Sequence, residues 1–136
     1  EFVPSEIGTL INAAAYDEES HPDDRSRIYP TRNYLSNARD ETWVRFKSFN
    51  FGDGASSVLI SAKSRYGNPG QVEFRLGSPD GELLASVEIK SKSSRWYEFP
   101  TFEGELLFTP LGQQDLYLVF KSGSRGHMSV DSFQFD

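Results

Sequence analysis

Residues 71–91, QVEFRLGSPDGELLASVEIKS, contain the pattern that decides the fold class. Val72, Phe74 and Leu76 alternate with polar or charged residues, which is the two-residue period of a strand with one buried face. The turn sequence SPDG follows, and a second apolar run begins directly after it. This stretch therefore predicts two short strands joined by a tight turn.

The same pattern recurs along much of the chain. Further strands are predicted at residues 43–49, 56–64, 115–123 and 127–135, and the sequences GDG, YGNPG and PLGQQ mark turns between them. No segment carries a sustained helical period, and INAAAY (11–16) is long enough for only a short helical turn. Many short strands punctuated by glycine and proline predict an all-β fold, an antiparallel β-sandwich of the jelly-roll type.

Composition limits the classes of function. The chain has 136 residues, which suffices for one domain with a core but not for two. Its net charge of -6 argues against a nucleic-acid partner and against an anionic membrane surface. The absence of cysteine excludes disulfides, thiol nucleophiles and zinc-thiolate sites. We interpret residues 1–9 as a linker or a cloning remnant, and residues 10–136 as the domain.

Motifs for catalysis are scarce. His21 and His127 are the only histidines, and neither stands in a metal-binding motif. The sequence contains no GxSxG motif and no phosphate-binding loop. A pair of glycosidase carboxylates is not excluded, but most of the acids fall in turns or on polar strand faces. We therefore predict that the protein is not an enzyme.

Three features leave alternatives open. Strand alternation puts Trp43 on the same face as Arg45 and Lys47, so this ring is either covered by neighbouring residues or part of a binding surface. Trp96, in SSRWYEFPTF (93–102), is either a core residue or a flat platform for a ligand. The long polar segment 17–40 is either a solvated surface loop or a functional one.

Several motifs taken together resemble one known family. VEFRLGSPDGELLASVEI, WYEF, DLYLVFKSG and MSVDSFQF are similar to the family 6 carbohydrate-binding modules, and INAAAYD and NYLSNARDETWVRF match more loosely. The resemblance covers nearly the whole chain. It implies a non-catalytic, secreted β-sandwich that binds polysaccharide and directs an attached glycoside hydrolase to it. The alternative is an adhesion or protein-binding sandwich without a sugar ligand.

The resemblance also suggests the ligand. Members of this family recognise xylan, cellulose, β-1,3-glucan, mixed-linkage glucan or agarose, and we favour a β-1,3-glucan for this chain. We expect the module to be a monomer.

The resemblance implies a main site in the loops at one end of the sandwich. Tyr34 and Trp96 match the aromatic pair that clamps a sugar ring, and Phe99 matches a second, core-facing aromatic. Ser129 stands where the family has an asparagine, and its hydroxyl reaches less far than an amide. Either the sugar sits deeper, or other loop residues such as Asn33, Asn37 or His127 supply the polar contact.

A second site on the concave face of one sheet is also implied. The matching residues are Trp43, Glu73 and Lys121, and strand alternation independently points all three outward. The acids of segment 17–40 can pair with basic residues on that face. We therefore expect one dominant site at the loop end, with the concave face silent or weak.

The family often carries a structural calcium near the chain ends. Asn12 and Ala14 stand where its first strand has acids, while Asp131 matches a remaining carboxylate. Calcium prefers several oxygen ligands with compensating negative charge. We therefore expect at most weak calcium binding, through Asp131 and Asn12.

Overall fold

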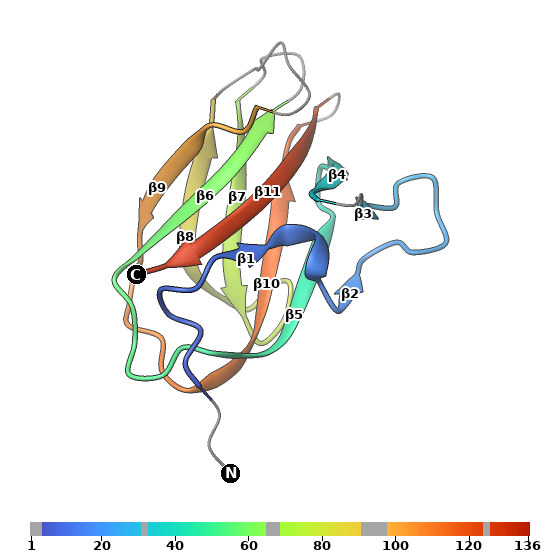
Figure 1. Cartoon of the computed structure of the whole chain (residues 1–136). Helices are drawn as coiled ribbons and strands as arrows, with labels where there is room; N and C mark the ends of the chain where they lie inside the picture. The colour runs from blue at the N-terminus through green and yellow to red at the C-terminus, as the bar shows by residue number, and fades with distance from the viewer. Residues whose placement is uncertain (1–3, 31–32, 65–68, 91–97, 124–125) are drawn as a thin grey trace.

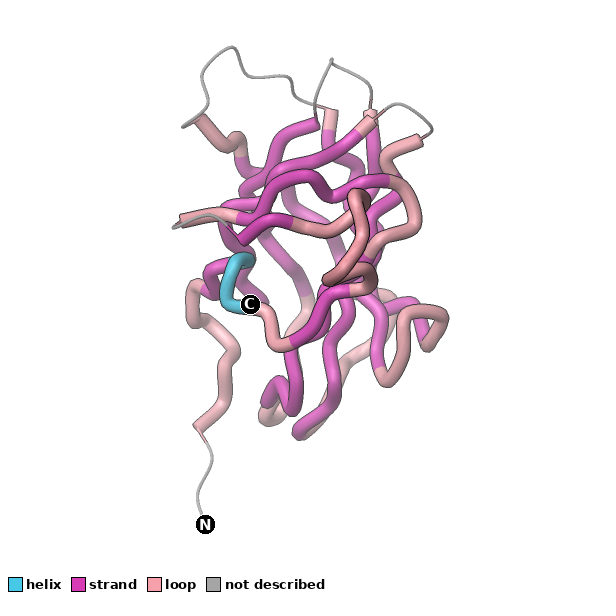
Figure 2. The backbone as a smooth tube through the Cα atoms, turned by 90° about the vertical axis from the view of Figure 1, so that its right-hand side faces the viewer, coloured by secondary structure: helices cyan, strands magenta, loops and turns pink. Residues whose placement is uncertain are grey.

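Two antiparallel sheets packed face to face form the protein. The computed structural model describes residues 4–30, 33–64, 69–90, 98–123 and 126–136 (Figure 1). One sheet has the order β3-β4-β11-β6-β9, with β1 also paired to β11, and the other has the order β2-β5-β10-β7-β8. Figures 1 and 2 show the two layers from two directions. The predicted antiparallel β-sandwich is confirmed.

The strand bounds agree with most of the sequence predictions. The six-stranded sheet contains β1 (Ile11–Asn12), β3 (Tyr29–Pro30), β4 (Leu35–Arg39), β6 (Ser57–Ser64), β9 (Thr101–Glu105) and β11 (His127–Phe135). The five-stranded sheet contains β2 (Glu18–Glu19), β5 (Trp43–Asn50), β7 (Gly70–Leu76), β8 (Glu82–Ile89) and β10 (Gln113–Lys121). All six strands expected from alternation are present, within a few residues of their predicted ends.

The core lies between the two sheets. The inward positions of β5, β7 and β10 are buried as the alternation predicts: Val44, Phe46, Val72, Phe74, Leu76, Leu116, Leu118 and Phe120. Phenylalanines from both sheets meet in its centre, where Phe74 of β7 packs edge-on against Phe133 and Phe135 of β11. Such large rings bury much apolar area, so they contribute strongly to stability.

Segment 17–40 contains more regular structure than its polar sequence indicates. It includes β2, β3 and β4, and β9 is a further strand that the periodicity did not predict. Two of these strands have only two residues, too short to show any period. The alanine-rich turn is a 3-10 helix (Ala13–Ala15) capped by the Asn12 side chain. In the described part of the chain, no helix has the length and apolar character needed to cross a membrane.

Residues near the start of the chain are held against the sandwich. The Glu6 amide donates to the Asn50 carbonyl (2.8 Å), and the Gly8 amide donates to the Phe135 carbonyl (2.7 Å). The Asn50 side chain in turn donates to the Pro4 carbonyl (3.1 Å). Part of the segment interpreted as a linker is thus bonded to the fold, and the domain boundary stays a prediction.

Candidate functional site

Tyr34 and Phe99 form an aromatic pair at the end of the six-stranded sheet where β6 ends and β11 begins. Their ring centroids are 5.2 Å apart with planes inclined by 51°, and both side chains are half-buried. The Lys63 ammonium lies 4.5 Å from the centre of the Phe99 ring. The two rings and the ammonium therefore form one cluster.

The prediction that Phe99 faces the core is wrong. Phe99 does not belong to the core cluster or to the partly buried residues packed against it. The register explains why: Ser61 pairs with Thr101, and the Ala62 amide donates to the Pro100 carbonyl (3.0 Å). Phe99 is thereby aligned with Lys63, whose neighbours Ala62 and Ser64 take the buried positions.

Ser129 lies in the same outward row. It is the cross-strand partner of Lys63, on β11, and is half-buried. Between Met128 and Val130 the pairing with β4 shifts by one residue, so Ser129 faces a bulge in β4. We call Tyr34, Lys63, Phe99 and Ser129 the Tyr34 patch. It combines aromatic rings with a hydroxyl and an ammonium group.

Asn37 occupies the bulge and is bonded within the chain. Its backbone has a φ of 62°, in the left-handed region that asparagine tolerates better than most residues. Its amide nitrogen donates to the Arg27 carbonyl (2.8 Å), and its amide oxygen accepts from Arg39 Nε (3.1 Å). Asn37 thus holds the preceding loop against β4, which competes with the sugar contact predicted for it.

The other residues of the predicted main site lie outside the Tyr34 patch or outside the described residues. Asn33 is exposed just before Tyr34, and His127 is paired with Arg39 at the start of β11. Trp96 lies outside the described residues. The structure therefore brings Tyr34 and Ser129 into one patch, while the place of Trp96 in that patch stays a prediction.

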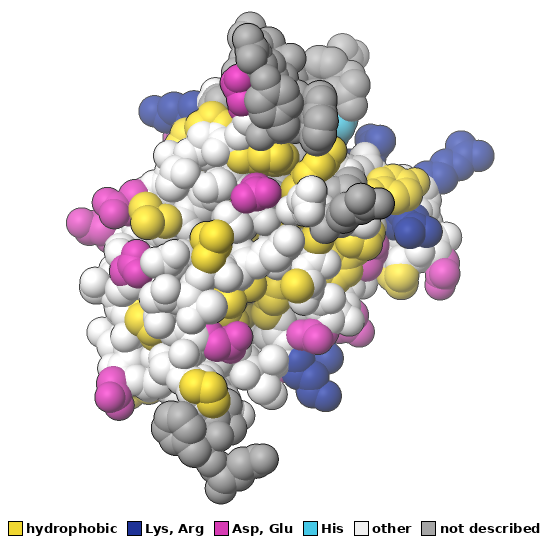
Figure 3. Space-filling model, viewed as in Figure 1, with side chains coloured by type: hydrophobic (Ala, Val, Ile, Leu, Met, Phe, Trp, Pro, Cys, Tyr) yellow, Lys and Arg dark blue, Asp and Glu magenta, His cyan; other side chains and the backbone are white. Residues whose placement is uncertain are grey.

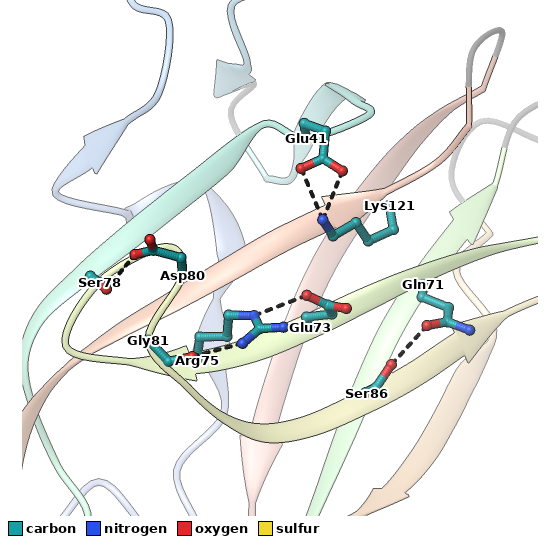
Figure 4. Close-up of polar contacts among 9 residues, drawn as sticks. All are labelled: Glu41, Gln71, Glu73, Arg75, Ser78, Asp80, Gly81, Ser86 and Lys121. Atoms are coloured by element: carbon teal, nitrogen blue, oxygen red, sulfur yellow. Dashed lines mark hydrogen bonds and ion pairs between the residues drawn. The ribbon is translucent and has the colours of Figure 1, made fainter.

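The residues of the predicted second site share the outward face of the five-stranded sheet. Val119 pairs with Trp43 on one side and with Glu73 on the other, so these three lie in one row across the strands. Lys121 is the next outward position along β10. Its ammonium donates to both Glu41 carboxylate oxygens (2.7 and 2.9 Å), and Glu73 accepts from Arg75 Nε (3.0 Å) (Figure 4). Both charged groups of this site are therefore already paired within the chain.

Trp43 covers part of this face. Its ring meets Tyr117 edge-on at 5.2 Å, and Tyr117 and Val119 are buried although they point outward. The Arg45 guanidinium lies beside them, 3.6 Å from a Glu18 oxygen and 3.9 Å from an Asp115 oxygen. A hydrogen bond with Tyr117 is the largest cause that raises the pKa of Arg45, and the two carboxylates raise it further.

A pocket of about 630 Å³ opens beside Trp43 at the edge of this sheet. Residues of segment 17–40 form most of its walls, together with Tyr16 and Trp43: Asp17, Glu18, Glu19, Ser20, Pro22, Arg27 and Pro30. Burial, and next the charge of Glu19, raises the pKa of the Tyr16 hydroxyl. The start of segment 17–40, with β2, thus lies at the edge of the five-stranded sheet, and Glu18 pairs there with Arg45, as expected for the acids of this segment.

Asn12 and Asp131 line one small hollow of about 140 Å³, together with Leu10 and Ser132. The Asn12 side-chain oxygen accepts from the Ala14 amide (2.9 Å), and Asp131 accepts from the Ser132 hydroxyl (3.0 Å). Among the residues that the structure describes, no group of three or more His, Cys, Asp or Glu lies close enough to hold a metal. One carboxylate beside an amide used as a helix cap does not fit the donors that calcium prefers.

Sequence reasoning missed Lys63 and the outward position of Phe99. The alternation in SSVLISAKS does place Lys63 on the outward face. Its two neighbours across the sheet depend on pairings of β6 with β9 and β11, which join segments far apart in the chain. No local pattern carries that information.

Comparison with known proteins gives consistent matches. Residues 12–136 match the family described as carbohydrate binding module (family 6). Endo-1,4-beta-xylanase A of Thermoclostridium stercorarium is 31% identical over 133 residues, which are 93% of this chain and 23% of the xylanase. Arabinoxylan arabinofuranohydrolase of Paenibacillus polymyxa is 29% identical over 105 residues, which are 74% of this chain and 16% of that enzyme. The chain thus spans less than a quarter of the length of these relatives.

Solved structures agree in fold. A β-1,3-glucan binding family 6 module from Bacillus halodurans superposes with a TM-score of 0.79 at 28% identity, covering 98% of both chains. A family 6 module from Clostridium stercorarium in complex with cellobiose gives a TM-score of 0.80 at 24% identity, covering 99% of this chain and 97% of that one. Because the family match extends over nearly the whole chain, this protein belongs to the family 6 carbohydrate-binding modules, which are non-catalytic binding domains.

Proposed function

We propose that the Tyr34 patch, completed by Trp96, is the polysaccharide-binding site of this module. The observation that carries the proposal is the Tyr34 ring, packed against Phe99 in a patch where Ser129 lies across from Lys63. A pyranose ring has an apolar C–H face that an aromatic ring covers well, while the hydroxyls at its rim need polar partners. The patch offers both kinds of group side by side.

Two classes of β-linked polysaccharide are candidates for the ligand. Likeness to the β-1,3-glucan binding module of Bacillus halodurans supports a β-1,3-glucan, which is our first choice. Likeness to the Thermoclostridium stercorarium xylanase supports xylan. Affinity electrophoresis against β-1,3-glucan, xylan, cellulose derivatives and agarose ranks them directly.

The role proposed for the module is to hold an attached glycoside hydrolase on its substrate outside the cell. The relatives described above are enzymes several times longer than this chain. A bound module raises the effective concentration of polysaccharide around a catalytic domain joined to it, without any new catalytic contact. The module acts as a monomer in this proposal.

The test compares variants by affinity electrophoresis with the polysaccharide that retards the wild-type protein. We expect Tyr34→Ala and Trp96→Ala to abolish retardation or weaken it strongly, because each removes one ring of the proposed clamp. Trp43→Ala, on the other sheet, is the matched aromatic control, and we expect this variant to be retarded as strongly as the wild-type protein. Full retardation of Tyr34→Ala would place the site elsewhere. If no polysaccharide retards the wild-type protein, an adhesion or protein-binding role becomes the better reading.

A further inference from the structure

Tyr29 is an exposed aromatic residue on the same sheet as the Tyr34 patch. Among the described residues, four large hydrophobic side chains are exposed, and Tyr29, at 43%, is the only aromatic one of them. It lies on β3, where it pairs with Ser36 of β4. Figure 3, drawn from the same side as Figure 1, shows hydrophobic and basic side chains next to one another at the right, over the segment that contains β3 and β4. Tyr29 thus belongs to an open surface near the proposed sugar site.

The strand register relates Tyr29 to Tyr34. Leu35 is buried, so the residues on either side of it, Tyr34 and Ser36, point outward. Tyr29 shares their face because it is the partner of Ser36 in an antiparallel pair. Tyr29 and Tyr34 are thus diagonal neighbours, a relation that sets residues roughly 7–8 Å apart. A sugar ring stacked on Tyr34 leaves Tyr29 free, while the adjacent unit of the same chain lies within its reach.

The backbone that carries Tyr29 is fastened to β4. The Arg27 carbonyl accepts from the Asn37 amide (2.8 Å), and the Tyr29 carbonyl accepts from the Ser36 hydroxyl (3.5 Å). Ile28, between them, is fully buried. A ring on a backbone held in this way loses less freedom when it binds a ligand, so more of the contact energy appears as affinity.

Arg27 supplies hydrogen-bond donors beside the ring. Its guanidinium carbon lies 4.9 Å from the centre of the Tyr29 ring. A guanidinium covers only one face of a ring, and Tyr29 remains 43% exposed, so part of the ring stays open. The guanidinium has five N–H donors and no acceptor, and sugar hydroxyl oxygens can accept from it. The pair therefore combines an apolar surface with polar groups, as a pyranose requires.

We propose that Tyr29 and Arg27 form a second sugar subsite, which binds a pyranose unit next to the one on Tyr34 within the same β-linked chain. This inference rests on the proposed function and extends its site across β3. It assigns a binding role to part of segment 17–40. The ligand is then a run of at least two sugar units, and one oligosaccharide still occupies one protein molecule.

The experiment compares saccharides of different length by calorimetric titration of the whole protein. Two series are used: glucose with its β-1,3-linked trisaccharide, and xylose with its β-1,4-linked trisaccharide. In the series that binds, we expect Tyr29→Ala to bind the trisaccharide about three- to tenfold more weakly than the wild type, the range of one aromatic contact. Its affinity for the monosaccharide should stay within about twofold. A trisaccharide has more ways to place a unit on Tyr34, but this advantage is common to both proteins.

Further variants separate the parts of the subsite. Tyr29→Phe keeps the ring and should bind the trisaccharide as the wild type does. Arg27→Gln should weaken the trisaccharide and not the monosaccharide, because it removes the charged donors. Leu107→Ala, an exposed hydrophobic residue in the turn after β9, is the control and should bind both ligands normally. Because Tyr29 and Arg27 are exposed, thermal unfolding of these variants should match the wild type closely.

The outcomes separate this inference from the proposed function. Unchanged affinity of Tyr29→Ala for the trisaccharide overturns the second subsite and leaves the Tyr34 patch as the whole site. Equal losses for monosaccharide and trisaccharide in Tyr29→Ala also overturn it, since Tyr29 would then act on the patch rather than on a further unit. If no member of either series binds the wild-type protein, the proposed function itself fails for both of its candidate ligands.

Discussion

Phe99 packs against Tyr34, and this contact holds the Tyr34 ring in place within the patch. A tyrosine ring at the surface loses binding energy when it must be ordered by the ligand, so a ring already held by a neighbour binds better. The tilted packing at 5.2 Å holds the Tyr34 ring in this way.

We therefore expect Phe99→Leu to weaken sugar binding by about 1 kcal/mol, the usual worth of an aromatic pair. Calorimetric titration measures the affinity, and thermal unfolding measures the stability of the same variant. Phe102→Leu is the matched control, because Phe102 is only partly buried and packs against the core. Phe102→Leu should lower stability and leave affinity unchanged. A Phe99→Leu variant that loses stability as Phe102→Leu does would show that Phe99 acts through the core.

Trp96 gives a second prediction at the scale of the residue. If it is a platform for sugar, Trp96→Ala removes binding but leaves the free energy of unfolding within about 1 kcal/mol, as for surface substitutions. Chemical denaturation checks this directly. A loss of several kcal/mol would instead identify Trp96 as a core residue and remove it from the site.

At the scale of the element, the bulge in β4 determines how the site is built. Ser129 faces this bulge, and Asn37 within it bonds both the Arg27 carbonyl and the Arg39 side chain. The amide of Asn37 thus joins the loop before β3 to the strand that follows Tyr34.

Asn37→Ala should destabilise the protein by about 1–3 kcal/mol, because it loses two hydrogen bonds and adds strain at a positive φ. Asn37→Gly loses the same bonds without the strain, so thermal unfolding should place it between the wild type and Asn37→Ala. Equal stability of the two variants would mean that the left-handed backbone costs nothing here.

The long strands could be predicted from sequence, but the short ones could not. Alternation in β5, β7 and β10 gave the buried faces correctly, since each strand has one face in the core. β2 and β3 have only two residues each, and β4 is bulged, so none of them shows a regular period. Their positions depend on pairing with distant strands.

The candidate site was predictable only in part for the same reason. Tyr34, Ser129 and the row from Trp43 to Glu73 followed from motif resemblance and alternation, and the structure places them in two separate groups. Lys63 enters the patch through its neighbours on β9 and β11, which sequence spacing does not reveal. The internal bonds of Asn37 likewise appear only in the folded chain.

At the scale of the whole molecule, the outward face of the five-stranded sheet differs from the Tyr34 patch because its charged groups are paired within the chain. On the five-stranded sheet, Glu73 and Lys121 are paired with Arg75 and Glu41, so a sugar must compete for both. Exposed pairs of this kind stabilise a protein by only about 0–1 kcal/mol, yet they still occupy the groups.

We expect calorimetric titration with a soluble oligosaccharide to give one site per chain. Trp43→Ala should leave the affinity nearly unchanged, because its ring belongs to the other face. A stoichiometry near two, with the second class of site lost in Trp43→Ala, would show that the paired charges on that face yield to sugar.

Metal dependence is the other property of the whole domain. The hollow beside Asn12 and Asp131 offers too few charged oxygens for a tight calcium site. Addition of EDTA should therefore shift the melting temperature by no more than about 2 °C and leave sugar binding intact. A large shift would mean that other oxygens complete a site around Asp131.

The bond between Gly8 and Phe135 brings the two ends of the domain together. Along β11, Phe135 is six residues from Ser129, or about 20 Å. A fluorescent protein joined beyond Gly8 or beyond Phe135 would thus start from the same pole of the sandwich, remote from the proposed sugar site. The order of the fusion should not matter for a probe that stains cell-wall material, and a short peptide joining the ends would permit circular permutation.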